Sequence, residues 1–240
     1  MKILNFLFVI IAQLCILAFV ASCSDKGLKP KEDDAAAACF QAMDYQYDAL
    51  LTKVDIAKHV AIDEASYKLE ISPVKGEYGS STYEWNSDRP DLEMELLGQM
   101  IKYPDVNRVT IKMLHFYSES ELKLYSQASA LALFDQSYKK LSQEEYNGLL
   151  ANLQKEYAND AAKYEQAKEF LDMRMNFTYA PMANLGNRAY WRWHEEHGVE
   201  LVVLTGTVHF TIASKTSGNQ QTALDDAVKF AQEVLAKCNR

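Results

Sequence analysis

Glycine-rich loops and catalytic signature motifs are absent from this sequence. It contains no glycine-rich phosphate loop, no GxSxG and no HExxH, so the common sequence signals of nucleotide binding, serine hydrolysis and zinc proteolysis are missing. Proline is scarce, with 5 residues in 240, and no stretch rich in proline or glycine marks a domain boundary. We therefore expect one folded domain and assign no catalytic residue.

Positive charge is in the minority. Lysine and arginine total 25, against 33 aspartates and glutamates, which gives a formal net charge of −8. Nucleic-acid binding requires basic patches, and charge-driven binding to anionic lipid requires clusters of lysine and arginine. The acidic balance argues against both, so we expect no nucleic-acid partner.

The longest apolar run lies at the start of the chain. Lys2 precedes an apolar run at 3–20 that only Asn5 and Gln13 interrupt, which is the layout of a secretory signal, and the run is nearly the ~20 residues that span a bilayer. It ends in the tetrad VASC at residues 20–23, which resembles the lipobox of bacterial lipoproteins. In that family the cysteine is diacylated, the signal is cut before it, and the new amine is acylated. The resemblance implies attachment of palmitate-type chains at Cys23.

Two other interpretations of this segment remain open. An uncleaved transmembrane anchor predicts basic residues or aromatic anchors after the apolar run, whereas small residues lead directly into Cys23 here. Conventional secretion, with removal of the signal and no lipid, is the other. Neither accounts for an apolar run that stops at a cysteine.

A lipidated Cys23 divides the chain into a signal peptide at 1–22, a lipidated cysteine with a flexible tether at 23–34, and a folded part at 35–240. Two or three acyl chains anchor a protein stably, whereas one does not. Removal of the signal leaves 218 residues (240 − 22) with a net charge of −9 (24 − 33), since one lysine is lost. We expect a cell-envelope protein with the membrane as its first partner. Ser24 in place of aspartate favours the outer membrane if the host has two membranes.

The few cysteines fit an oxidising compartment. Cys15 leaves with the signal and Cys23 carries lipid, so Cys39 and Cys238 remain as an even pair. Each lies on the apolar face of a predicted helix, one at either end of the folded part. We expect a disulfide between them, and two separately buried thiols are the alternative. Two sulfurs without a CxxC motif do not indicate a metal site.

The periodicity of apolar residues predicts an α+β fold: a mostly antiparallel sheet of about six strands, packed by N- and C-terminal helices, with a helical insertion at about 119–175. Strands are expected at 66–72, 81–86, 106–117, 188–194 and, as two strands hinged at a glycine, within 199–214. In the third strand we expect Val109, Ile111 and Met113 on one face. Helices are expected at about 36–50, 119–138 and 161–174. Three more are expected to begin at caps, namely capping boxes at Thr52 and Ser142 and a cap at Thr222. Residues 179–187 are expected to form a loop.

The two ends of the folded part resemble a known group of proteins. The segment NLGNRAYW at 184–191, the strands VELVVLTGTVHFTIA at 199–213 and the closing helix DDAVKFAQEVLAKC resemble small bacterial lipoproteins of unknown function, as do LLTKVDIAKHV and GEYGSSTYEW earlier in the chain. Those families are similar in fold to PsbP-like α/β/α sandwiches. They often carry a cysteine beside the tyrosine of the second strand, where this chain has Ser80, Ser81 and Thr82. The resemblance implies the sandwich fold and brings no catalytic residue.

Histidines are the best candidate metal ligands in the sequence. His194 and His197 are three residues apart in HEEH, with His209 on a neighbouring strand and acidic residues nearby, namely Glu195, Glu196 and Glu200. On a tight turn between strands, however, HEEHG is typical of a solvated polar loop. We therefore expect no metal site and no cofactor. His59 and His115 stand alone and are expected to be structural or surface residues.

Aromatic residues and paired carboxylates also have structural explanations. Trp85, Trp191 and Trp193 could line a ligand surface, but Trp191 and Trp193 share one face of a strand, which is typical of a core. Asp225-Asp226 and Asp33-Asp34 lie at a helix start and on the tether, where the helix dipole or solvent accounts for them.

Three classes of function fit these observations. We favour a non-enzymatic envelope module that binds a protein or a small ligand, because lipid anchoring and a compact sandwich need no chemistry. A metal-dependent or other hydrolase of the envelope is the alternative, and the histidine turn is the only feature of the sequence that supports it. A scaffolding role in an envelope complex would use the inserted helices.

Overall fold

The computed structural model describes residues 34–96, 98–124, 129–176 and 179–238. They form two compact units: one contains the chain up to Tyr117 and from Ala180 onward, and the other is Ser118–Tyr179. Within the described ranges, no helix combines the length and the apolar content needed to cross a bilayer.

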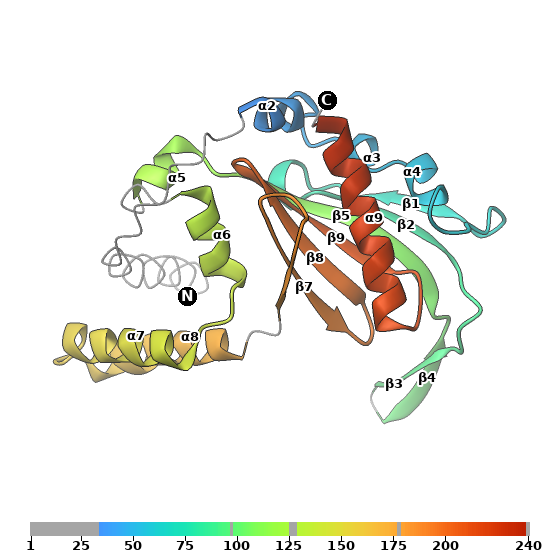
Figure 1. The fold of residues 1–240 in the computed structure, drawn as a ribbon. Coiled ribbons are helices and arrows are strands. Elements are labelled where there is room, and N and C mark those ends of the chain that lie inside the picture. Colours follow the sequence, from blue (N-terminus) through green and yellow to red (C-terminus); the bar gives the residue numbers. More distant parts are fainter. Residues whose placement is uncertain (1–33, 97, 125–128, 177–178, 239–240) are drawn as a thin grey trace. The chain divides into compact units, whose positions relative to one another are not determined.

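The larger unit is built on a seven-stranded antiparallel sheet with the order β1-β2-β5-β9-β8-β7-β6 (Figure 1). The strands are β1 Lys68–Ile71, β2 Ser80–Asn86, β5 Val106–Phe116, β6 Ala180–Met182, β7 Arg188–His194, β8 Gly198–Thr205 and β9 Val208–Lys215. The predicted α+β fold is confirmed, and every strand that the sequence predicts is present.

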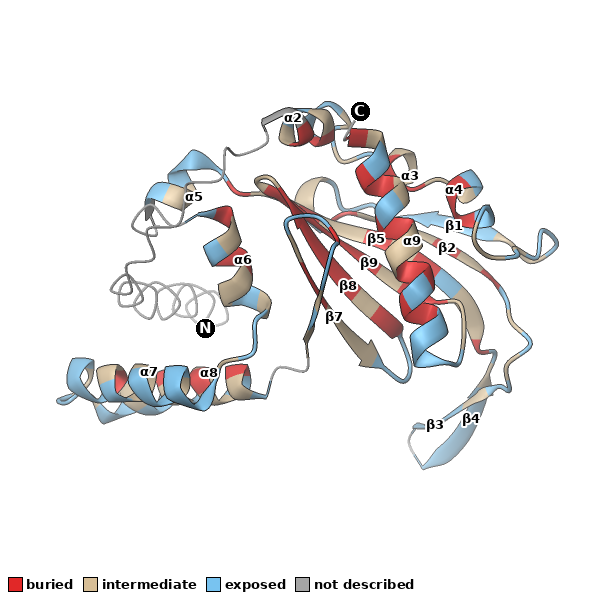
Figure 2. Ribbon diagram, viewed as in Figure 1, coloured by how far each residue is buried: buried red, intermediate tan, exposed pale blue. Residues whose placement is uncertain are grey.

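One face of the sheet is covered by the C-terminal helix α9, Gln220–Cys238, which lies over β8 and β9 (Figure 1). Because strand residues alternate between faces, Leu201, Val203 and Phe210 point to this side, where they are fully buried. They share one core with Phe230 of α9, and Figure 2 shows buried residues concentrated in the central strands and along α9. Burial of each such side chain stabilises the fold by about 1.5–3 kcal/mol.

The N-terminal helical segment is interrupted. The sequence predicts one helix over about 36–50, but the structure has α2, Asp34–Ala42, and α3, Tyr47–Leu50. Between them Asp44 (φ 41°) and Tyr45 (φ 58°) adopt left-handed conformations, which cannot continue an α-helix. The ring of Tyr45 packs edge-on against Phe116, with centroids 5.7 Å apart. This contact holds the break against the core.

Of two helix starts that the sequence predicts from caps, the structure confirms one and corrects the other. The predicted capping box at Thr52 is confirmed: its hydroxyl accepts the N–H of Asp55 at 3.2 Å and the Asp55 carboxylate accepts the N–H of Thr52 at 3.0 Å, opening α4, Lys53–Ala57. The predicted cap at Thr222 is wrong, because α9 already begins at Gln220. Asn219 accepts the N–H of Thr222 at 3.0 Å and is the residue that caps the helix.

A β-bulge changes the expected face of β5. Val109 and Ile111 are fully buried as predicted, but Met113 takes a φ of 58° and the register with β9 shifts around it. The next core residue is therefore Leu114, and Met113 is only partly buried. The bulge frees the N–H of Leu114 from the ladder, and this group donates to Tyr47 Oη at 3.1 Å.

The predicted loop at 179–187 contains a short edge strand instead. β6 pairs antiparallel with β7, which adds the strand that sequence periodicity does not indicate, because three residues around a proline have no recognisable period. The rest of the segment turns through Asn184 (φ 60°) and Gly186 (φ 59°). A Cβ on Gly186 would lie 2.3 Å from the carbonyl oxygen of Leu204, so only glycine fits here.

A separate two-stranded sheet is also present that the sequence pattern does not predict. β3, Leu92–Leu96, pairs antiparallel with β4, Gln99–Tyr103. We call this pair the β3–β4 ribbon. By register, its two faces differ in chemistry: Leu92, Leu96, Gln99, Ile101 and Tyr103 lie on one face, and Glu93, Glu95, Met100 and Lys102 lie on the other.

The smaller unit consists of α5 Glu119–Leu124, α6 Ala130–Tyr138, α7 Gln143–Glu156 and α8 Ala161–Met175. The sequence predicts one helix across the first two, but Ser129 has an extended backbone (φ −75°, ψ 157°) and its hydroxyl accepts the N–H of Ala132, so α6 starts anew. The predicted capping box of Ser142 with Glu145 is confirmed at the start of α7. α7 and α8 pack around a small apolar cluster of Leu153, Ala167 and Leu171.

Candidate functional site

Of the three cysteines to which the sequence assigns a role, the structure describes two. Cys23 lies outside the described residues, so its lipidation stays a prediction. Cys39 and Cys238 are joined by a disulfide with their Cα atoms 5.3 Å apart, a spacing ordinary for such a bond. It links α2 to the last turn of α9 across a sequence separation of 199 residues.

Charged residues beside the disulfide tie α4 to α9. Asp55 accepts a hydrogen bond from Lys237 Nζ at 2.6 Å, and Lys58 Nζ bridges Asp55 at 2.9 Å and Glu233 at 2.8 Å. Burial alone would raise the pKa of Asp55, but hydrogen bonds from these lysines and other neighbours outweigh burial and hold it far below its usual range. His59 Nε2 lies 2.9 Å from Glu233, which gives this histidine the structural role that the sequence predicts.

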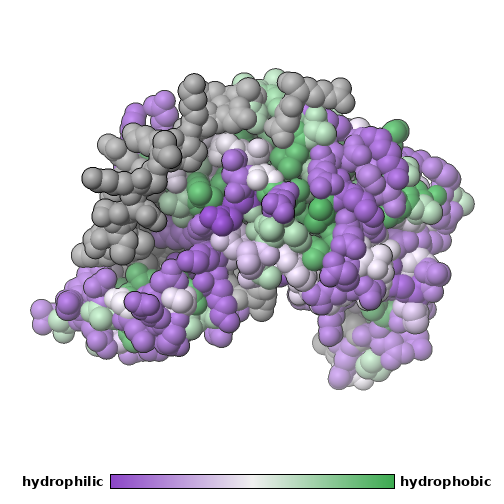
Figure 3. Space-filling model, viewed as in Figure 1, coloured by the Kyte–Doolittle hydropathy of each residue, from purple (hydrophilic) through white to green (hydrophobic). Residues whose placement is uncertain are grey.

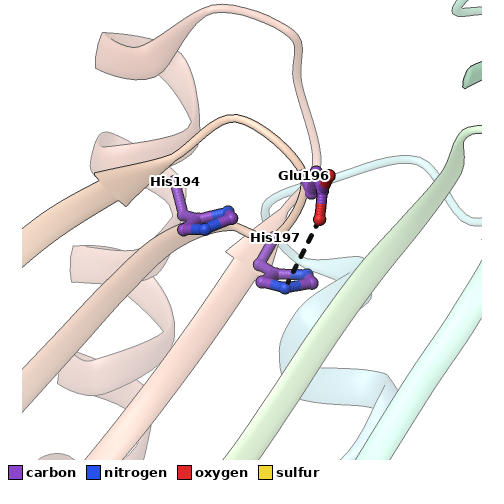
Figure 4. Close-up of side chains that lie close together, drawn as sticks. All are labelled: His194, Glu196 and His197. Atoms are coloured by element: carbon purple, nitrogen blue, oxygen red, sulfur yellow. Dashed lines mark ion pairs between the residues drawn. The ribbon is translucent and has the colours of Figure 1, made fainter. Parts of the chain in front are cut away.

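The turn between β7 and β8 groups three possible metal ligands (Figure 4). His194, Glu196 and His197 each offer one ligand atom, and these atoms all lie within 4.8 Å of one another. The two imidazole rings are nearly parallel, at 16°, with centroids 4.5 Å apart, and His197 Nε2 lies 3.9 Å from Glu196 Oε2. All three side chains are exposed. Glu195 is in the same turn but outside this group.

The backbone of this turn is held in place by a glycine. Gly198 pairs with His194 across the hairpin and has a φ of 77°. A Cβ at this position would lie 2.2 Å from the carbonyl oxygen of Ser214 on β9. Side chains are therefore excluded, and close backbone contact with β9 fixes the end of the hairpin that carries the two histidines.

His209 and Glu200 do not join the turn, although the sequence suggests them as neighbours. His209 pairs in register with Leu204, whereas the turn lies at the Gly198 end of β8. Glu200 interacts with Arg192 Nη2 at 3.2 Å and Lys112 Nζ at 3.5 Å. The candidate group is therefore smaller than the set of residues that sequence spacing brings together.

His209 belongs to a second histidine cluster, which sequence spacing does not indicate. Its ring centroid lies 5.0 Å from that of His115 and 5.4 Å from that of Tyr117, and His115 Nδ1 lies 2.9 Å from Glu77. Burial, and secondly the neighbouring His115, lower the pKa of His209 to about 3. His209 is therefore neutral at physiological pH, as a buried histidine in the sheet should be. The β5 bulge lies just before His115, so no regular alternation could have placed this residue.

The tryptophans and paired carboxylates have structural roles. Trp85 is buried in the core, and Trp191 and Trp193 are partly buried and packed against it. Asp226 is buried and accepts hydrogen bonds from Thr216 at 2.9 Å and from Lys229 at 3.1 Å. Asp33 lies outside the described residues.

An ion-pair group fixes the base of the β3–β4 ribbon. Asp105 accepts from Arg89 Nε and Lys215 Nζ, both at 2.9 Å, and Arg89 also donates to Asn107 Oδ1 at 2.7 Å. Burial would raise the pKa of Asp105, but the bonds from the two cations outweigh it and lower the pKa. Because Arg89 and Asp105 flank the ribbon in sequence, this group ties both of its ends to the sheet.

Comparison with known proteins gives no relative: no family model, no curated protein and no solved structure matches this chain.

Proposed function

We propose that this protein is a lipid-anchored protein of the cell envelope whose folded part is a non-enzymatic binding or assembly module. The observation that carries this proposal is the apolar run that stops at Cys23 behind Val-Ala-Ser, in the arrangement of a bacterial lipoprotein signal. The pairing of Cys39 with Cys238 supports it, because disulfides persist in oxidising compartments such as the bacterial envelope. Ser24 favours the outer membrane of a two-membrane host.

The β3–β4 ribbon supports a binding role. Leu96 is 49% exposed and Ile101 39%, so apolar side chains of both strands face solvent on the same side of the ribbon, and Met100, 61% exposed, faces solvent on the other side. Figure 3 shows hydrophobic residues at this end of the larger unit amid a hydrophilic surface. A two-stranded ribbon by itself is marginally stable in water, and exposed apolar residues on a fixed projection are typical of a contact surface. We propose that this ribbon contacts an envelope partner.

Labelling with palmitate in the native host tests the anchor. The wild type and Cys15→Ala, a matched control within the apolar run, should incorporate label. Cys23→Ala should incorporate none and should keep its signal, so that it migrates as the larger precursor. Equal labelling of Cys23→Ala would contradict the proposal.

Site-specific photo-crosslinking in intact cells tests the binding surface. A photoreactive residue replaces Ile101, which is 39% exposed on the apolar face of the ribbon, or, as control, Met173, which is 52% exposed on α8. We expect a discrete adduct from position 101 that is absent at position 173. Identical adducts from both positions, or none from position 101, would contradict a contact at the ribbon.

A further inference from the structure

We propose that the turn between β7 and β8 is a binding site for one divalent transition-metal ion of the zinc class, with His194, Glu196 and His197 as its protein ligands. This goes beyond the binding function above and does not depend on it, and it replaces the expectation from the sequence alone that this turn holds no metal. Two imidazole nitrogens and one carboxylate oxygen form a donor set that zinc, nickel and copper accept. Spacing in the sequence pairs the two histidines, and the structure adds Glu196 to them while it excludes His209 and Glu200.

The distances leave only a small adjustment for metal binding. Ligand atoms at 2.0–2.2 Å from a tetrahedral zinc ion lie about 3.3 Å from one another. In the structure the three ligand atoms lie within 4.8 Å of one another, so each pair has to close by at most about 1.5 Å. Rotation of exposed side chains covers this distance. The nearly parallel rings already bring the two histidines side by side, as Figure 4 shows.

The backbone needs no rearrangement. Gly198 is locked against β9 by close contact, and His194 is the last residue of β7, paired with Gly198. Both histidines are thus held at the end of a hairpin that belongs to the central sheet. The cost of binding is then confined to the ordering of three side chains, which is the condition for a usable site at a surface.

The exposure of the ligands defines what kind of site this is. With three protein ligands, a tetrahedral ion keeps one position for water or for a ligand atom from another molecule. Because all three side chains are exposed, the ion exchanges freely with solvent and is bound reversibly. We therefore expect a labile zinc site open to exogenous ligands, and not a closed structural zinc site.

Titration of the full-length, detergent-purified protein with Zn²⁺ tests the proposal by calorimetry. Ni²⁺ provides a second readout, because it quenches nearby indoles and Trp193 directly precedes His194. We expect one Zn²⁺ per chain, at least tenfold weaker binding in His194→Asn and in His197→Asn, and a smaller loss in Glu196→Gln. Glu195→Gln removes the same charge from the same turn without removing a ligand, so it should bind like the wild type.

Two results would overturn the site. One is the absence of stoichiometric binding at Zn²⁺ concentrations up to roughly 100 µM. The other is an affinity that is unchanged in both histidine variants or lowered equally in Glu195→Gln. The variants replace exposed residues, and far-ultraviolet circular dichroism identical to that of the wild type establishes that each is folded.

Discussion

Replacement of Cys39 by serine should destabilise the oxidised protein strongly. The bond to Cys238 restrains a loop that spans 199 residues, and for a loop of that length the chain-entropy model gives about 5 kcal/mol of stabilisation as an upper figure. Single domains have a total free energy of unfolding of about 5–15 kcal/mol, so the loss is a large share of it. At about 2–4 °C per kcal/mol for a chain of this size, the melting temperature should fall by roughly 10–20 °C.

Thermal unfolding followed by circular dichroism, with and without reductant, measures this effect. Reductant should lower the melting temperature of the wild type to that of Cys39→Ser and leave the variant unchanged. Cys238→Ser and the double variant serve as controls, and both should match Cys39→Ser, because each removes the same single bond. Alkylation of both cysteines by iodoacetamide in freshly extracted, unreduced protein would refute the reasoning, as would a wild type that is insensitive to reductant.

The remaining predictions concern the dependence of stability on pH and the effect of replacing glycine. The folded pKa of His209, about 3, lies below the unfolded value of about 6.5, so the free energy of unfolding should fall by about 2 kcal/mol between pH 7 and pH 5. Urea unfolding at these two pH values should show a smaller fall in His209→Gln than in the wild type. Equal falls would contradict the burial of His209. The lowered pKa of Asp55 gives stability that is complete above about pH 4 and lost below it, so Asp55→Asn should cost about 1–3 kcal/mol at pH 7. Adding Lys237→Met to that variant should cost little more, because both substitutions remove the same Asp55–Lys237 ion pair. Gly198→Ala should lower the free energy of unfolding by more than about 3 kcal/mol. Gly76→Ala, with a similar φ of 75° but open space around it, should lower it by about 1–2 kcal/mol. Equal losses would contradict the close contact of Gly198 with β9.

Local sequence patterns predict the regular parts of this fold well. Alternation in SSTYEWN identifies β2, whose Tyr83 and Trp85 are buried, and the hydroxyl–carboxylate spacing at Thr52 identifies the start of α4. These features depend on residues within one or two turns of each other. The apolar periods also place Cys39 and Cys238 on core-facing helix sides, which is why their proximity could be anticipated.

Features set by tertiary contacts could not be read from the sequence. The bulge at Met113 breaks the two-residue period because Tyr47, far away in the chain, accepts the freed N–H of Leu114. The β3–β4 ribbon buries little apolar surface, so it has no core-facing pattern beyond its own alternation. At the candidate metal site, HEEH spacing singled out two histidines, but only the tight turn at Gly198 shows that Glu196 is the carboxylate that joins them.

The most direct test of the proposed function is the mass of the mature N-terminal peptide from protein purified out of native membranes. Proteolysis followed by mass spectrometry should find a chain that begins at Cys23, carries a diacylglyceryl group on its sulfur and, in a complete modification, a third acyl chain on its amine. A chain that begins at Met1, or a mature terminus at Cys23 without lipid, would contradict the account of an acyl-anchored envelope protein.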